Sequence, residues 1–199
     1  MRAHRQSTTA VLLIDVINAF DFKGSTGIVK AAERAAPKIE RLVGRARARA
    51  VPVIYVNDNF GQWRSDFRST VHACAQPDRA GWRIVRRLRP REEDYFVLKP
   101  QHSAFYCTVL ELLLEDLGTR TLVVAGFAAN FCVLFTANDA HMRGFRLVVP
   151  ADCTAANTPA LTRDALRHIE ALGGTVTEST RVDFGRLATR SRKPRRSPF

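Results

Sequence analysis

The sequence predicts an α/β protein in which a six-stranded, mostly parallel, doubly wound sheet carries helices on both faces. Short apolar runs alternate with stretches whose apolar residues recur at helical spacing, along nearly the whole chain. Residues 10–14 and 122–125 are apolar throughout, which is typical of parallel strands that are covered on both sides, whereas residues 175–177 indicate an edge strand. Because right-handed crossovers connect such strands, helices are expected above and below the sheet.

Each predicted element begins or ends at a recognisable signal. Apolar runs predict strands over residues 8–16, 52–57, 95–98, 122–125, 145–149 and 175–177. Helical spacing predicts helices over residues 29–50, 107–117 and 159–172, a helix that begins at Cys132, and a helical stretch over 69–89 that breaks at Pro77-Asp78. Gly126 ends the fourth strand, and Gly173-Gly174 cap the last helix.

Length and charge divide the chain into a domain and a tail. A chain of 199 residues is long enough for one domain with a full core, which we assign to residues 1–185. The formal net charge is +12, and five of the positive charges lie in the last ten residues. Residues 186–199 are therefore predicted to be a basic, disordered tail that binds polyanions only weakly. No nucleic-acid-binding signature accompanies the remaining basic residues, so no specific nucleic-acid partner is expected.

Composition also bears on location and on the state of the cysteines. The longest apolar runs are strand-sized, and the first residues lack the apolar core of a signal peptide. We therefore expect a cytoplasmic protein with no membrane partner. The four cysteines form no CxxC pair and no zinc-ligand spacing, which predicts free thiols.

Three chemically unusual residues fall where predicted strands end. Asp15 and Lys99 each follow an apolar run directly, and Cys132 follows the turn after the fourth strand. Each alone fits a structural role: a cap, a loop-facing side chain or a small buried hydrophobic residue. However, the carboxyl ends of parallel strands face one ligand crevice, so the three together indicate a site there. The N-terminus of a helix is expected to lower the pKa of Cys132 and favour its thiolate.

Further motifs carry a resemblance to a known family. They are Leu13-Ile14-Asp15-Val16-Ile17-Asn18-Ala19-Phe20, Lys99 with Ser103-Ala104-Phe105 and Thr108, Gly126-Phe127-Ala128-Ala129-Asn130-Phe131-Cys132-Val133, Thr136-Ala137 with Asp139-Ala140, and Asp152-Cys153-Thr154-Ala155. In this order they resemble the isochorismatase-like cysteine hydrolases, over residues 9–178. The resemblance implies a three-layer α/β/α fold, a catalytic triad of Asp15, Lys99 and Cys132, and a non-proline cis peptide between Ala128 and Ala129. It also implies a homodimer or homotetramer.

Departures from the family pattern narrow the expected chemistry. Ile17 stands where the family often has Gln, and Ala129 where it often has Thr. Nicotinamidases carry an Asp-x-His metal site after the second strand, whereas residues 57–60 here read Asn-Asp-Asn-Phe. We therefore expect no metal and no cofactor, and the chain resembles the metal-free members of the family more than the nicotinamidases. Isochorismatases often lack the cysteine, so Cys132 favours hydrolysis of an amide or ureido C–N bond in a small-molecule substrate.

The resemblance implies a role for each residue of the triad. Asp15 would take the proton of Cys132, return it to the leaving amine and then activate the water that cleaves the thioester. Lys99 would stabilise both charged groups, and the backbone N–H groups of Ala129 and Cys132, beside Ala128, would form the oxyanion hole. Candidate walls of the substrate pocket, each equally compatible with ordinary core packing, are Phe20, Asn57, Trp63, Phe105 and Phe131. His102 lies close to Lys99 in the sequence but fits no ligand pattern.

Two other functions stay open at this point. One is a vinyl-ether hydrolase of isochorismatase type, in which Asp15 protonates the substrate and Cys132 is dispensable. The other is a catalytically inactive member of the family that serves as a scaffold.

Overall fold

The computed structural model describes residues 6–61, 63 and 66–189. The strands are β1 (Thr9–Ile14), β2 (Val53–Asp58), β3 (Tyr95–Lys99), β4 (Thr121–Phe127), β5 (Arg146–Pro150), β6 (Thr154–Ala155) and β7 (Thr175–Thr177). The helices are α1 (Thr26–Ala48), α2 (Phe67–Cys74), α3 (Trp82–Arg87), α4 (Leu110–Asp116), α5 (Leu134–Met142), α6 (Pro159–Ala171) and α7 (Phe184–Thr189). A π-helical turn, Ala129–Val133, leads directly into α5, and two short 3₁₀ turns are Ala151–Cys153 and Ser179–Arg181.

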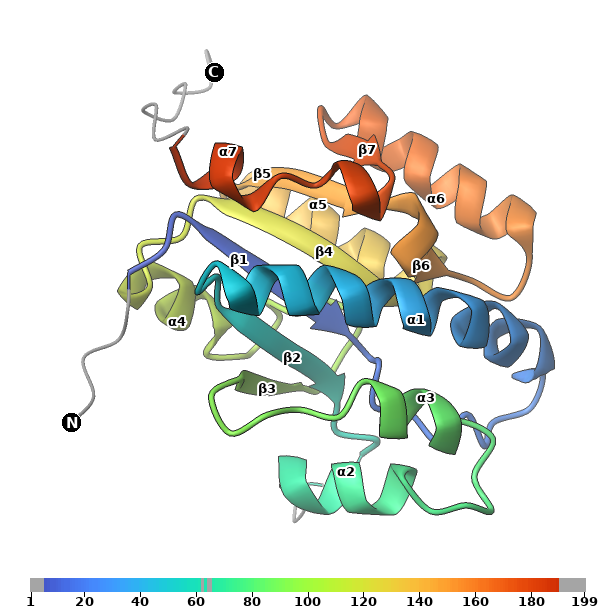
Figure 1. Ribbon diagram of the computed structural model, residues 1–199. Coiled ribbons are helices and arrows are strands. Elements are labelled where there is room, and N and C mark those ends of the chain that lie inside the picture. Colours follow the sequence, from blue (N-terminus) through green and yellow to red (C-terminus); the bar gives the residue numbers. More distant parts are fainter. Residues whose placement is uncertain (1–5, 62, 64–65, 190–199) are drawn as a thin grey trace.

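The sheet has the predicted doubly wound topology. Its strand order is β3-β2-β1-β4-β5-β7, and every pairing is parallel (Figure 1). The six predicted strands are confirmed, while β6, which pairs with β4, is an addition. The winding reverses between β1 and β4, and a ligand crevice is expected at that switch point, beyond the carboxyl ends of the strands.

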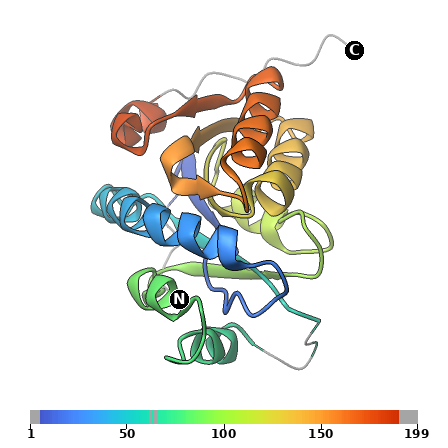
Figure 2. The same ribbon diagram turned by 90° about the vertical axis from the view of Figure 1, so that its right-hand side faces the viewer.

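Alternating side chains of β1 divide the core into two layers, one on each face of the sheet. Val11 and Leu13 pack with the buried stripe of α1, whereas Leu12 and Ile14 pack against α4 and α5. Figure 2 shows α1 on one side of the sheet and α4, α5 and α6 on the other. This arrangement confirms helices on both faces, because a strand whose side chains are all buried must be covered on both sides.

One predicted boundary is confirmed and another differs. The helical stretch is interrupted around Pro77 as predicted, since α2 ends at Cys74 and α3 begins at Trp82. At the other end, α7 continues to Thr189, so regular structure extends beyond the predicted domain end at residue 185. Residues 190–199 of the predicted tail lie outside the described residues.

Gly126 allows β4 to lie close to β1 next to the site. Its φ is +121°, and a Cβ at this position would lie 2.1 Å from the carbonyl oxygen of Ile14. Gly126→Ala is therefore expected to lower the free energy of unfolding by about 3 kcal/mol, because backbone atoms of β1 must move. Chemical denaturation would measure the change.

Gly44 provides the matched control for that substitution. It lies exposed within α1, and a Cβ there would meet nothing within 4 Å. Gly44→Ala is expected to be neutral or to stabilise by up to about 1 kcal/mol, because alanine has the higher helix propensity. If both variants unfolded like the parent protein, the close approach of β4 to β1 would not limit the residue at 126.

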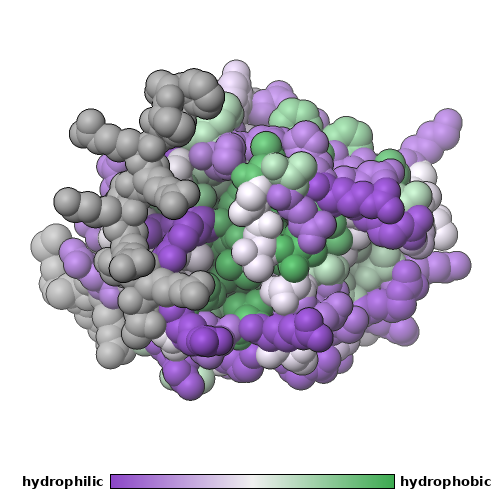
Figure 3. All heavy atoms as spheres, turned by 90° about the horizontal axis from the view of Figure 1, so that it is seen from above, coloured by the Kyte–Doolittle hydropathy of each residue, from purple (hydrophilic) through white to green (hydrophobic). Residues whose placement is uncertain are grey.

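A cavity of about 1200 Å³ lies at the amino ends of the strands, near the first residues of β4, β5 and β7. Its lining includes Thr121, Arg146 and Thr175. Figure 3 looks onto the β7 edge of the molecule and shows apolar surface surrounded by polar residues. Because Asp15 and Lys99 lie at the opposite ends of their strands, this cavity is separate from the predicted crevice.

No helix in the described ranges is long and apolar enough to cross a membrane.

Candidate active site

The structure brings Asp15, Lys99 and Cys132 together at the carboxyl edge of the sheet. Asp15 follows β1 directly, Lys99 is the last residue of β3, and Cys132 lies in the π-helical turn after β4. The Nζ atom of Lys99 lies 2.9 Å from Oδ2 of Asp15 and 3.5 Å from Sγ of Cys132. Lys99 is fully buried and Asp15 is 5% exposed, while Cys132 is partly exposed. The thiol therefore lies between a buried ion pair and the solvent.

Asp58 is a fourth polar residue of this site, and the sequence reasoning missed its role. It ends β2 beside Lys99 in the sheet register. Its backbone N–H donates to Oδ1 of Asp15 over 2.7 Å, and its Oδ2 lies 3.6 Å from Lys99 Nζ. The signal was the same one that identified Asp15 and Lys99: a charged residue at the end of an apolar strand. Asp58 thus orients the carboxylate of Asp15 through its backbone N–H, and its own carboxylate lies near the same lysine, Lys99.

Burial and mutual contact shift the pKa values of the ion pair. Burial raises the pKa of Asp15 above its ordinary value, and this effect exceeds the opposing influence of Lys99 and of the hydrogen bonds to the carboxylate. Burial alone would lower the pKa of Lys99, but the charges of Asp15, Cys132 and Asp58 outweigh it and raise that pKa. Asp15 is consequently a better proton acceptor than an exposed aspartate, beside a lysine that stays charged.

The sequence-based expectation that the pKa of Cys132 is lowered is wrong, because the structure raises it. Burial, followed by the negative charge of Asp15, raises the pKa of this thiol to about 12, although Lys99 opposes the change. The helix N-terminus was expected to dominate, but a carboxylate in contact with the sulfur and the loss of hydration outweigh it. Cys132 is therefore a thiol in the resting site, and it needs a base to become a nucleophile.

Substituting Asp15 is expected to separate thiol reactivity from turnover. Asp15→Asn removes the charge that disfavours the thiolate, so the pKa of Cys132 should fall and its alkylation by iodoacetamide at pH 7 should accelerate. Each pKa unit changes the thiolate fraction about tenfold. Turnover should nevertheless fall by about 10³-fold, because the general base is lost. Peptide mass spectrometry would measure the alkylation rate.

Cys107 serves as the internal reference for this measurement. It is a free and exposed thiol in the same molecule. Its alkylation should be the same in both proteins and faster than that of Cys132 in the parent. Rapid alkylation of parental Cys132 at pH 7, or slower alkylation in the variant, would contradict the electrostatic account.

His102 lies on the open side of Cys132. Its Nδ1 atom is 3.7 Å from Sγ of Cys132, and the His102 side chain is exposed. The rings of Phe131 and Phe135 flank it, each with a centroid 5.5 Å from that of His102. Phe131 and Phe135 are 50% and 49% exposed. No sequence spacing pointed to this cluster, because His102 and Cys132 meet only through the fold.

The other candidate pocket walls have different positions. Phe20 and Phe105 are 1% and 5% exposed and pack in the two core layers, which fits the core role that the sequence left open. Asn57 is fully buried and donates from Nδ2 to the carbonyl of Ile17 over 2.6 Å, so it holds the loop after Asp15. Trp63 is 81% exposed. Of the five candidates, Phe131 is the one whose ring contacts His102, next to Cys132.

The turn before Cys132 contains a non-proline cis peptide between Phe127 and Ala128. The predicted position, between Ala128 and Ala129, is one residue too late, because β4 continues to Phe127 and the turn begins there. The carbonyl of Ala128 accepts from the N–H groups of Phe131 and Val133 at 3.1 and 3.2 Å. The oxyanion-hole role of the Ala129 and Cys132 N–H groups stays a prediction.

Among residues 6–61, 63 and 66–189, no cluster of three or more His, Cys, Asp and Glu side chains is placed to hold a metal ion. The four cysteines are free thiols, as predicted. Among the described residues, Cys132 has polar side-chain contacts with Lys99, with the carboxylate of Asp15 and with the ring of His102. This set can deprotonate a thiol, stabilise the thiolate and contact a ligand from the solvent side.

Comparison with known proteins shows the family. Residues 9–181 match the isochorismatase domain family. The chain is 39% identical over 161 residues to the uncharacterized isochorismatase family protein YaaI of Bacillus subtilis, covering 81% of this chain and 88% of YaaI. It is 31% identical to the ureidoacrylate amidohydrolase RutB of Methylorubrum extorquens, covering 85% and 79% of the two chains. The crystal structure of N-carbamoylsarcosine amidase from Thermoplasma acidophilum superposes with a TM-score of 0.68 at 26% identity, over 88% and 99% of the chains. With its Asp15–Lys99–Cys132 site, the chain belongs to the isochorismatase-like hydrolase family.

Proposed function

We propose that this protein is a cysteine hydrolase that cleaves an amide or ureido C–N bond of a small molecule through a thioester on Cys132. The observation that carries the proposal is the thiol itself, placed 3.5 Å from Lys99 Nζ and in contact with the carboxylate of Asp15. The relatives named as a ureidoacrylate amidohydrolase and an N-carbamoylsarcosine amidase support a C–N bond as the target.

Acylation begins with proton transfer from Cys132 to Asp15. The raised pKa of Asp15 brings it closer to that of the thiol and eases the transfer. The thiolate attacks the carbonyl carbon. The ammonium group of Lys99 stabilises the negative charge, first on Asp15 and then on the sulfur of Cys132. Oxyanion-hole donors would contribute about 3 kcal/mol each. Asp15 then returns its proton to the departing nitrogen, the C–N bond breaks and the acyl group stays on sulfur.

The experiment that tests this proposal is a release assay on a panel of primary amides and ureido acids. Glutamate dehydrogenase would detect ammonia, and peptide mass spectrometry on quenched reactions would look for an acyl group on the Cys132 peptide. Ammonia release together with an acylated Cys132 supports the proposal. Ammonia release that persists in Cys132→Ala would exclude the covalent route.

A vinyl-ether hydrolase is the second candidate, and the raised pKa of Asp15 favours it, because an aspartic acid that holds its proton can protonate a substrate. Isochorismate would be included in the panel, with lactate dehydrogenase detecting pyruvate. Pyruvate release without ammonia release, retained in Cys132→Ala, would establish this function instead. A protein that turns over no member of the panel and leaves Cys132 unmodified would fit the inactive scaffold.

A further inference from the structure

We propose that His102 is a catalytic residue of deacylation, which takes a proton from the water that hydrolyses the Cys132 thioester. The inference rests on the proposed thioester function. Nδ1 of His102 lies 3.7 Å from Sγ of Cys132. The carbonyl carbon of a thioester is one covalent bond from Sγ, so it comes within the reach of one water molecule from Nδ1. An imidazole ring nitrogen can accept a proton from water as a general base.

Asp15 is poorly placed to activate that water. Its Oδ1 accepts from the Asp58 N–H over 2.7 Å, and its Oδ2 pairs with Lys99 over 2.9 Å. Asp15 is 5% exposed, whereas His102 is exposed. Water enters from the solvent side, so it meets the imidazole before it can reach the carboxylate. The two bases thus divide the reaction between them: Asp15 serves the thiol and His102 serves the water.

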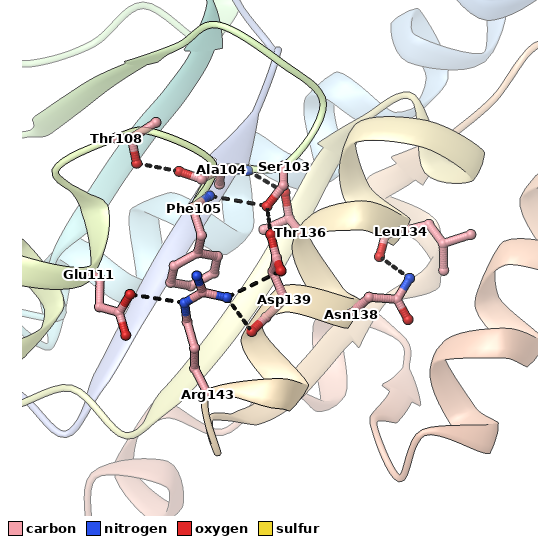
Figure 4. Close-up of polar contacts among 10 residues, drawn as sticks. All are labelled: Ser103, Ala104, Phe105, Thr108, Glu111, Leu134, Thr136, Asn138, Asp139 and Arg143. Carbon is pink, nitrogen blue, oxygen red and sulfur yellow. Dashed lines mark hydrogen bonds and ion pairs between the residues drawn. The ribbon is translucent and has the colours of Figure 1, made fainter.

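A network of polar contacts holds the residue after His102 against the helix that follows Cys132. Ser103 is 6% exposed, and its hydroxyl bonds to the carboxylate of Asp139. The N–H of Ala104 donates to Oγ1 of Thr136 over 3.0 Å. Thr136 and Asp139 lie four and seven residues after Cys132, on one face of the helical segment. Figure 4 shows Ser103 and Ala104 directed at these two side chains.

Arg143 extends the network by another helical turn. It pairs with Asp139 over 3.2 Å and with Glu111 of α4 over 2.9 Å, and its guanidinium covers the ring of Phe105 at 4.8 Å (Figure 4). The segment 103–105 is therefore attached to α5 by side-chain and backbone contacts. Since His102 directly precedes this segment, its backbone is positioned by these contacts. Its exposed ring lies beside the thiol and contacts the rings of Phe131 and Phe135.

The proposed step balances in protons and electrons. His102 accepts a proton as the water oxygen bonds to the thioester carbon. The tetrahedral intermediate then collapses, the C–S bond breaks with its electron pair on sulfur, and a carboxylic acid leaves. Imidazolium returns its proton to the Cys132 thiolate 3.7 Å away, which restores the resting thiol and the neutral histidine.

The experiment compares acylation with deacylation in His102→Gln, using p-nitrophenyl acetate as the acylating probe. Nitrophenolate release in the first turnover reports acylation, and the later steady rate reports deacylation. We expect the first-turnover rate to change less than about twofold and the steady rate to fall about 100-fold, the contribution of one general base. Acetylated Cys132 should accumulate and be found by peptide mass spectrometry. Hydroxylamine, which attacks thioesters without a general base, should restore the steady rate.

His141→Gln is the matched control, since His141 is an exposed histidine in the last turn of α5, away from Cys132. It should behave like the parent. Unchanged steady turnover in His102→Gln, or an equal loss of both phases, would overturn the role of His102 in deacylation. If the parent protein forms no acetyl adduct on Cys132, the proposed thioester function itself fails. If the parent and His102→Gln both form the adduct and hydrolyse it equally fast, only the role of His102 fails.

Discussion

Replacing Cys132 with alanine is expected to abolish hydrolysis of the C–N substrate identified by the release assay, with a loss of about 10⁴-fold or more in kcat. Removal of a catalytic nucleophile is among the largest single effects in enzymes that work through a covalent intermediate, since the remaining groups then have no sulfur to act on. The side chain is partly exposed, and alanine loses only its sulfur atom, so the protein should fold normally. Steady-state ammonia release and thermal denaturation would measure the two properties.

Cys107→Ala is the control for that variant, because Cys107 is exposed, free and outside the triad. Its activity should equal that of the parent. Full activity in Cys132→Ala, together with loss of activity in Cys107→Ala, would show that Cys107 and not Cys132 is the nucleophile.

Replacing Lys99 with methionine is expected to damage both stability and turnover. Lys99 is fully buried and pairs with Asp15 at 2.9 Å, so its loss leaves a buried carboxylate without its counter-charge. Breaking a buried pair from one side costs about 3–5 kcal/mol. The pKa of Asp15, already raised by burial, should rise further. Turnover should fall by about 10³-fold, because a thiolate would form beside no cation.

The stability loss in Lys99→Met should depend on pH. A carboxyl group whose pKa is raised in the folded state is best accommodated when protonated, so its destabilising effect is absent below its unfolded pKa and develops as pH rises towards the folded value. The deficit against the parent should therefore shrink from pH 7 to pH 4 in urea denaturation. Lys38→Met is the matched control: Lys38 approaches Asp152 at 4.0 Å but its side chain is 43% exposed, so the loss should stay below about 1 kcal/mol. An equal and pH-independent loss in both variants would contradict the special role of the buried pair.

The sequence was sufficient for the sheet and for the three residues of the triad, because both follow from local patterns. Mainly apolar runs marked five of the six predicted strands, the short edge strand β7 (Thr-Val-Thr) had a weaker signal, and a charged residue at a strand end marked Asp15 and Lys99. The two-residue strand β6 was missed because no periodic signal exists over so short a length.

The remaining features of the site depend on distances that no local pattern contains. The raised pKa of Cys132 follows from its burial in the fold and then from its contact with Asp15, which is far away in the sequence. The proximity of His102 to Cys132 likewise depends on how the segment after β3 is held against α5. Phe20 and Phe105 could be assigned to core or pocket only once their packing was known.

The central place of β1 has a consequence during synthesis. β1 leaves the ribosome before β4, yet one of its two hydrogen-bonding edges is covered by β4, which begins only at Thr121. Translation of the intervening residues takes on the order of ten seconds. For that interval a mainly apolar strand has an unpaired edge, the arrangement that favours association between nascent chains. The strand that places Asp15 at the centre of the site thus also gives the unfinished chain an edge at which another chain could pair.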